Sequence, residues 1–131
     1  MIERVLIVED EPLIAFDSEH FLIEQGYHVV ATVDSVAQAL AVIETEPIDL
    51  VLADVALSNN GDGMAVARAA HARGIATLFV TGACPPEARQ FAVGCLMKPY
   101  GHRQLRQVID AVQAVMRGEA PEHIPAGLSL Y

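Results

Sequence analysis

Residues 4–12 read Arg-Val-Leu-Ile-Val-Glu-Asp-Glu-Pro, a short apolar run that ends in three acidic residues and a proline. The apolar part, residues 5–8, lacks the alternation of polar and apolar positions, which is typical of a strand buried on both faces of a sheet. Pro12 suits the first turn of a helix. The stretch therefore predicts a central parallel strand that leads through three carboxylates into a helix.

Four more apolar runs follow, and segments with helical periodicity separate them. The runs lie at residues 29–33, 50–53, 76–80 and 95–97. Ser35 with Gln38 forms a capping-box pattern, and Asp62 can cap a further helix. Residues 85–91 are the weakest helix candidate because two prolines open them. This alternation predicts a five-stranded parallel sheet between two layers of helices, a three-layer α/β/α sandwich.

Length and composition bound the remaining possibilities. The 131 residues fit one domain, which we predict to span residues 1–117, with a loose tail at 118–131. A formal charge of -9 argues against nucleic-acid binding, and no apolar run is long enough for a membrane span. We expect a cytoplasmic protein. Cys84 and Cys95 stand in apolar or turn surroundings, and we interpret them as small buried thiols.

Polar residues follow four of the predicted strands. They are Glu9-Asp10-Glu11, Asp54, Thr81-Gly82 and Lys98, the one lysine in the chain. Parallel strands bring these ends to one edge of the sheet, where ligands of such folds bind. Two like charges about 4 Å apart repel by roughly 4 kcal/mol at an effective dielectric near 20. Clustered carboxylates therefore indicate a cation, and Mg²⁺ prefers such oxygen ligands.

The ordered motifs of the chain resemble the receiver domain of two-component response regulators over roughly residues 1–117. The matching residues are Val8-Glu-Asp-Glu11, Asp49-Leu-Val-Leu-Ala-Asp54, Asp62-Gly63, Val80-Thr81-Gly82 and Lys98-Pro99. The resemblance implies a flavodoxin-like fold with sheet order 2-1-3-4-5. It also implies phosphorylation of an aspartate by a histidine kinase, or by a small donor such as an acyl phosphate.

The resemblance assigns a magnesium site to four residues. Asp10 is expected to bind Mg²⁺ directly together with Asp54, and the main-chain carbonyl of Ala56 is expected to supply another ligand. Glu9 replaces the more common aspartate and is expected to act through a metal-bound water.

The resemblance also assigns the phosphoryl chemistry. Asp54 becomes the phosphoacceptor, a carboxylate nucleophile of the kind that forms aspartyl phosphates. Lys98 is expected to contact a phosphoryl oxygen, and Thr81 to donate its hydroxyl to the phosphoryl group. Gly82 leaves its backbone N–H open to the same group. Such a receiver catalyses its own phosphorylation and dephosphorylation, and we would not class it as an enzyme.

Two departures from the common receiver pattern stand out. Cys95 occupies the position, three residues before Lys98, where many receivers carry an aromatic side chain. Residues 79–84, Phe-Val-Thr-Gly-Ala-Cys, are similar to a receiver subfamily with Phe-Ala-Thr-Gly-apolar-Tyr on the fourth strand. Members of that subfamily also lack the aromatic, are often stand-alone and are associated with atypical histidine kinases. Cys84 in place of the tyrosine makes the match partial.

Three classes of function remain to be compared. A phosphorylation-driven module would act through a downstream protein target or as a phosphoryl sink, with a histidine kinase or phosphotransfer protein as its donor. A phosphorylation-independent binding module would tolerate loss of an acid or of Lys98, yet all are present. An enzyme on an α/β sheet is disfavoured because no Gly-x-Gly-x-x-Gly follows the first strand. The sequence leaves a phosphorylation-dependent dimer open.

Overall fold

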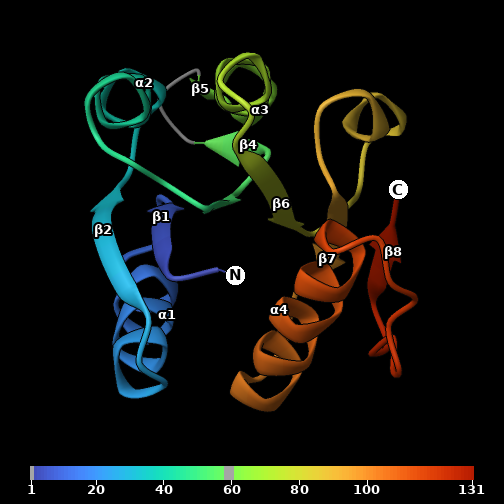
Figure 1. Ribbon diagram of the computed structural model, residues 1–131. Helices are drawn as coiled ribbons and strands as arrows, with labels where there is room; N and C mark the ends of the chain where they lie inside the picture. The colour runs from blue at the N-terminus through green and yellow to red at the C-terminus, as the bar shows by residue number, and fades with distance from the viewer. Residues whose placement is uncertain (1, 58–60) are drawn as a thin grey trace.

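A six-stranded sheet forms the centre of the computed structural model, which describes residues 2–57 and 61–131 (Figure 1). Its strand order is β2-β1-β3-β6-β7-β8. The six strands are β1 (Arg4–Val8), β2 (His28–Val33), β3 (Leu50–Ala53), β6 (Ala76–Thr81), β7 (Gly94–Met97) and β8 (Leu128–Leu130). The first five in this order pair in parallel, which confirms the predicted flavodoxin-like sheet.

The sixth strand corrects the prediction of a loose tail and of a five-stranded sheet. β8 pairs antiparallel with β7, and Leu128 is buried against the core. The chain can approach β7 this closely because Gly94 has no side chain: a Cβ there would lie 2.8 Å from the carbonyl oxygen of Ser129. The segment therefore covers what would otherwise be an edge strand.

The helices cover the two faces of the sheet, as predicted (Figure 1). They are α1 (Pro12–Glu24), α2 (Val36–Thr45), α3 (Gly63–Ala72), the 3₁₀ helix η1 (Pro86–Gln90) and α4 (His102–Met116). α1 and α4 pack on one face, whereas α2 and α3 pack on the other. Within the described part of the chain, no helix has the length and apolar character needed to cross a membrane.

Central strand β1 shows why its sequence has no alternation. Val5 and Ile7 pack into the cluster with α1 and α4, whereas Leu6 and Val8 pack into the cluster with α2 and α3. All four side chains are at most 2% exposed. A strand buried on both faces must be apolar at every position, so its polar residues can stand only at its ends.

Helix starts follow the predicted capping residues. The Ser35 hydroxyl accepts a hydrogen bond from the Gln38 amide at 3.3 Å, and the Asp62 carboxylate accepts one from the Met64 amide at 2.9 Å. Asp62 also belongs to β5 (Gly61–Asp62), which pairs antiparallel with β4 (Ala56–Leu57) just beyond Asp54. Residues 58–60, which follow β4, lie outside the described residues.

The two cysteines correct a second prediction. Cys84 and Cys95 are joined by a disulfide with their Cα atoms 6.1 Å apart, and they are not free thiols. Cys84 precedes η1 and Cys95 lies in β7, so only the tertiary fold brings the two residues together.

Gly63 allows α3 to start against the backbone of Asp54. A Cβ on Gly63 would lie 2.3 Å from the carbonyl oxygen of Asp54 and 2.7 Å from the Cα of Val55, and neither backbone atom can move freely. We predict that Gly63→Ala lowers the free energy of unfolding by about 1–3 kcal/mol, the usual effect of overpacking. Gly82→Ala is the matched control, because its Cβ would meet nothing within 4 Å. Urea denaturation measures both variants, and equal stabilities would contradict this account of Gly63.

Candidate functional site

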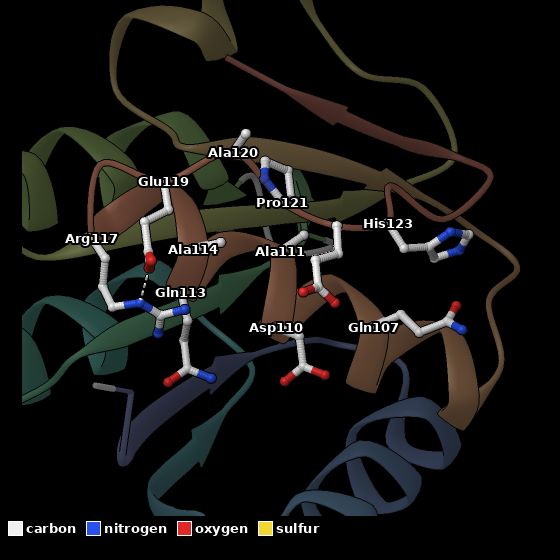
Figure 2. Close-up of a pocket in the computed structure, with 11 residues that line it drawn as sticks. Gln107, Asp110, Ala111, Gln113, Ala114, Arg117, Glu119, Ala120, Pro121 and His123 are labelled. Atoms are coloured by element: carbon white, nitrogen blue, oxygen red, sulfur yellow. Dashed lines mark hydrogen bonds and ion pairs between the residues drawn. The ribbon is translucent and has the colours of Figure 1, made fainter.

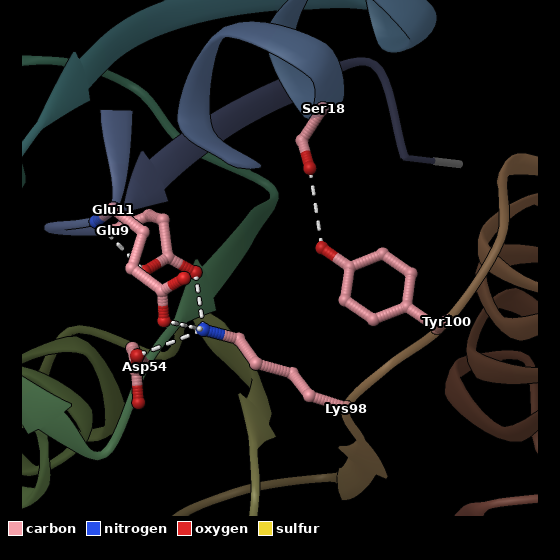
Figure 3. A network of polar contacts seen from close by, with 6 residues as sticks. All are labelled: Glu9, Glu11, Ser18, Asp54, Lys98 and Tyr100. Atoms are coloured by element: carbon pink, nitrogen blue, oxygen red, sulfur yellow. Dashed lines mark hydrogen bonds and ion pairs between the residues drawn. The ribbon is translucent and has the colours of Figure 1, made fainter. Parts of the chain in front are cut away.

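One ammonium group and three carboxylates meet at the carboxyl edge of the sheet (Figure 3). The Lys98 Nζ lies 2.7 Å from Glu9 Oε1, 3.0 Å from Asp54 Oδ2 and 3.5 Å from Glu11 Oε1. We call these four residues the acidic cluster. The carboxylate oxygens of Glu9, Glu11 and Asp54 lie within 4.8 Å of one another.

Backbone hydrogen bonds that continue the sheet fix the cluster in place. The Asp54 amide donates to the Val8 carbonyl at 3.0 Å, which brings Asp54 beside the end of β1. The Glu9 amide donates to the Val33 carbonyl at 2.9 Å. On the other side, the Lys98 amide donates to the Thr81 carbonyl at 2.8 Å. Sequence reasoning placed these residues at one edge, and the strand pairing does the same.

The cluster is unusually buried for charged groups. Glu9 is 4% exposed and Asp54 is 5% exposed, whereas Glu11 lies at the rim, largely exposed. Glu9 Oε1 is buried and, although it is close to Lys98, receives no well-directed hydrogen bond. Since Lys98 is shared with Asp54 and Glu11, it neutralises this buried carboxylate only in part, and the oxygen is suited to an additional cation.

The electrostatic environment of the cluster raises the pKa of one acid, Glu9, and of the base, Lys98. Burial raises the pKa of the Glu9 carboxyl by more than the neighbouring Lys98 ammonium lowers it, and Asp54 raises it further. Burial alone would lower the pKa of Lys98, but its contacts with Glu9 and Asp54 outweigh burial and raise that pKa. Lys98 therefore stays an ammonium at neutral pH, and it faces more negative charge than it can neutralise alone.

The remaining predicted residues lie around this centre. Thr81 ends β6 and is 5% exposed, and Gly82 is exposed directly after it. Asp10 is half-buried but does not belong to the group of close carboxylates, so its role as a direct metal ligand stays a prediction. Ala56 lies in β4, two residues beyond Asp54, and its role as a ligand stays a prediction as well.

Sequence reasoning gave no role to two features of the site. Glu11 stands in the close group, although of the three acids at 9–11 only Glu9 and Asp10 were given metal roles. The Tyr100 hydroxyl and the Ser18 hydroxyl of α1 are 3.1 Å apart, which ties the chain after Lys98 to α1 (Figure 3). The acidic run at 9–11 signalled the first feature. No local pattern signals the second, because it joins residues 82 positions apart.

A separate cavity does not coincide with the acidic cluster. It has a volume of about 520 Å³ and lies between α4 and the segment that follows it (Figure 2). The half-buried Gln107, the exposed Asp110 and the Arg117–Glu119 ion pair are among the residues that line it. No residue predicted for the site lines this cavity. The acidic cluster therefore remains the candidate functional site.

Comparison with known proteins identifies the family of the chain. The profile of the response regulator receiver domain matches residues 5–110. The virulence-factor transcription regulator BvgA of Bordetella pertussis is 29% identical over 125 residues, which cover 90% of this chain and 58% of BvgA. The regulatory protein PdtaR of Mycobacterium tuberculosis is 36% identical over 77 residues, covering 59% of this chain and 37% of PdtaR. The chain thus spans little more than half of BvgA, and less of PdtaR.

Solved structures show the same relationship. SdrG from Sphingomonas melonis Fr1 superposes with a TM-score of 0.74 at 36% identity, covering 86% of this chain and 97% of SdrG. A CheY-like receiver domain from Methanospirillum hungatei JF-1 superposes with a TM-score of 0.77 at 25% identity, covering 90% of this chain and 99% of that one. With the profile matching most of its length, the chain belongs to the response regulator receiver family of two-component systems.

Proposed function

We propose that this chain accepts a phosphoryl group on Asp54 and passes the signal on through protein contacts or acts as a phosphoryl sink. The observation that carries the proposal is the Asp54 carboxylate at the mouth of the core, 3.0 Å from the only lysine of the chain. A carboxylate this buried has little structural reason to lie among other acids. It has a chemical reason if an anionic group is to be transferred there and neutralised.

The mechanism follows from the positions of the side chains. A carboxylate oxygen of Asp54 attacks the phosphorus of the donor, and the bond from phosphorus to the donor's leaving atom breaks with its electron pair. Lys98 holds one phosphoryl oxygen as negative charge spreads over the three of them. The Thr81 hydroxyl and the Gly82 N–H are proposed to donate to the others. Positioning and electrostatics supply the catalysis. Because the acceptor is the chain's own Asp54, no separate substrate is turned over.

The acidic cluster fits a magnesium ion. Its close carboxylates, among them the buried Glu9, provide the hard oxygen ligands that Mg²⁺ prefers. Asp54 and Asp10 are proposed to hold the ion with the Ala56 carbonyl, and Glu9 to act through water. When bound, Mg²⁺ would neutralise charge on the transferred phosphoryl group.

A histidine kinase or a phosphotransfer protein is the proposed donor, and the cytoplasm is the proposed location. Such a donor must contact the surface around Asp54. Helix α1 starts directly after Glu11 and exposes large apolar side chains there, with Leu13 84% and Phe16 67% exposed. Exposed apolar groups of this size near a reactive site are typical of a protein-docking surface.

The phosphoacceptor is tested by the intact mass of the protein after incubation with acetyl phosphate. We predict one phosphoryl adduct that requires Mg²⁺ and is lost in Asp54→Asn, because the amide cannot act as the nucleophile. Asp110→Asn, an exposed position on α4, is the matched control and should keep the adduct. An adduct that persists in Asp54→Asn at the wild-type rate would exclude Asp54 as the acceptor.

The electrostatic account predicts that Glu9→Gln stabilises the metal-free protein at pH 7.5 by roughly 1 kcal/mol, the usual size of a single-site effect. Burial raises the pKa of Glu9 above the 4.5 of an unperturbed carboxyl, so ionisation costs the folded state free energy above that raised pKa. The advantage of the variant should disappear as the pH falls toward 4.5. Urea denaturation at both pH values measures it, with exposed Glu44→Gln as control.

Adding Mg²⁺ completes the same experiment. Wild type should gain stability from the ion, Glu9→Gln should gain less, and Asp10→Asn should gain least, since a direct ligand matters more than one that acts through water. If Glu9→Gln is less stable than wild type without Mg²⁺, the net cost of ionising the buried Glu9 is disproved. If Glu11→Gln loses more of the gain than Asp10→Asn, the direct ligand is Glu11.

The docking surface predicts a difference between donors. Phe16→Ala should slow transfer from a phosphorylated histidine protein by about tenfold, the loss expected for an aromatic anchor worth roughly 1.4 kcal/mol. Phosphorylation by acetyl phosphate, which needs no docking surface, should keep its rate. Ile124→Ala removes an apolar side chain that is 53% exposed in the C-terminal segment, and it serves as the control. Equal slowing with both donors would indicate damage to the site itself.

A further inference from the structure

The disulfide lies between two residues of the proposed phosphoryl site. Cys84 follows Thr81 by three positions, and Cys95 precedes Lys98 by three. The bond closes a ring that contains η1 and joins the loop after β6 to β7. We call residues 82–94 the switch segment. If Thr81 and Gly82 move toward a phosphoryl group, they pull on this segment. The disulfide fastens Cys84, near the start of the segment, to β7.

Noncovalent contacts hold the middle of the switch segment, η1, only weakly. η1 is a single short 3₁₀ helix with no side-chain cap, and Ala88 is its one buried residue. At its ends, the Arg89 guanidinium stands 5.5 Å from the centre of the Tyr131 ring, and Phe91 packs edge-on against His71 with the ring centroids 5.7 Å apart. Segments with few buried apolar contacts open at low free energy. The disulfide adds a covalent restraint to these contacts and ties Cys84, at the start of the segment, directly to β7.

The two sulfur atoms differ in access. Cys95 is fully buried among apolar side chains that include Phe79 and Ala92, whereas Cys84 is only half-buried. A thiolate from outside can therefore reach the Cys84 sulfur in preference to the other. Disulfides in reducing compartments, where we expect this chain, are usually redox-active.

We propose that Cys84–Cys95 is a reversible redox site that decides whether phosphorylation of Asp54 displaces the switch segment. The oxidised ring keeps the segment on β7, and the reduced pair releases it to follow Thr81. The phosphoryl step of this inference rests on the proposed function, but the redox step does not. At the position where many receivers carry an aromatic side chain, this chain thus has Cys95, whose disulfide restrains the switch segment covalently.

The redox chemistry balances with a dithiol reductant of the thioredoxin class. One thiolate of the reductant attacks the Cys84 sulfur, the Cys84–Cys95 bond breaks, and Cys95 leaves as a thiolate that takes up a proton. The second thiol of the reductant, as its thiolate, attacks the mixed disulfide and releases Cys84, which is protonated in turn. The reductant ends as a disulfide, having supplied two electrons. A disulfide oxidant such as oxidised glutathione reverses the sequence.

The first measurement establishes the redox site. Protein treated with oxidised glutathione, and protein treated with thioredoxin, are denatured, alkylated with N-ethylmaleimide and weighed intact. We expect no adduct on the oxidised protein and two on the reduced protein, with the disulfide restored on reoxidation. A bond that thioredoxin cannot reduce, or that glutathione cannot restore, overturns the proposal.

The second measurement tests the coupling. Amide NMR shifts are recorded for both redox states with Mg²⁺ and beryllofluoride, a stable mimic of the phosphoryl group. We expect the shift changes in residues 82–94 to be large in the reduced protein and mostly lost in the oxidised protein. Cys84→Ser, a change at a half-buried position, should show the large changes under both treatments. Equal changes in both redox states of wild type overturn the inference.

The acetyl phosphate adduct, weighed in the same samples, separates the two proposals. If neither redox state forms the adduct, the proposed function fails. If both form it and the switch segment responds equally, the proposed function stands and the redox coupling is wrong.

Discussion

The attraction between Lys98 and the carboxylates at the carboxyl edge of the sheet is the interaction on which the rest of the site depends. Three apolar strands end at this edge, so their polar residues converge there whatever else the fold requires. The Lys98 ammonium offsets part of the repulsion among Glu9, Glu11 and Asp54. Burial of Glu9 keeps the cost of its negative charge high. The excess negative charge favours a divalent cation, and with it an anionic phosphoryl group beside Lys98.

The same strand ends connect the site to the surface. Thr81 and Lys98 share a main-chain hydrogen bond, and the segment between them carries η1 and both cysteines. A change at Asp54 therefore has a short physical route through neighbouring strands to an exposed segment of low stability. Signalling needs such an element with two accessible arrangements, and a covalent latch on it would control access to the second one.

The sequence predicts the parts of the structure that depend on local pattern. The apolar runs at 5–8 and 50–53 determine central strands, and the acids after them determine the site. It does not predict β8, because three residues carry little periodicity and their pairing depends on the close approach allowed at Gly94. It also misses the disulfide, since whether Cys84 meets Cys95 depends on the path of the intervening chain. The position of the Glu11 side chain likewise depends on Lys98, which is 87 positions away in the sequence.

The most direct test of the account is to locate the phosphoryl group chemically in the wild-type protein. Borohydride reduces an aspartyl phosphate to homoserine, and peptide mass spectrometry then identifies the position that has changed. After incubation with acetyl phosphate and Mg²⁺, the account predicts homoserine at position 54 and at no other aspartate. Homoserine at position 10, or phosphate on a histidine with position 54 unchanged, would contradict it.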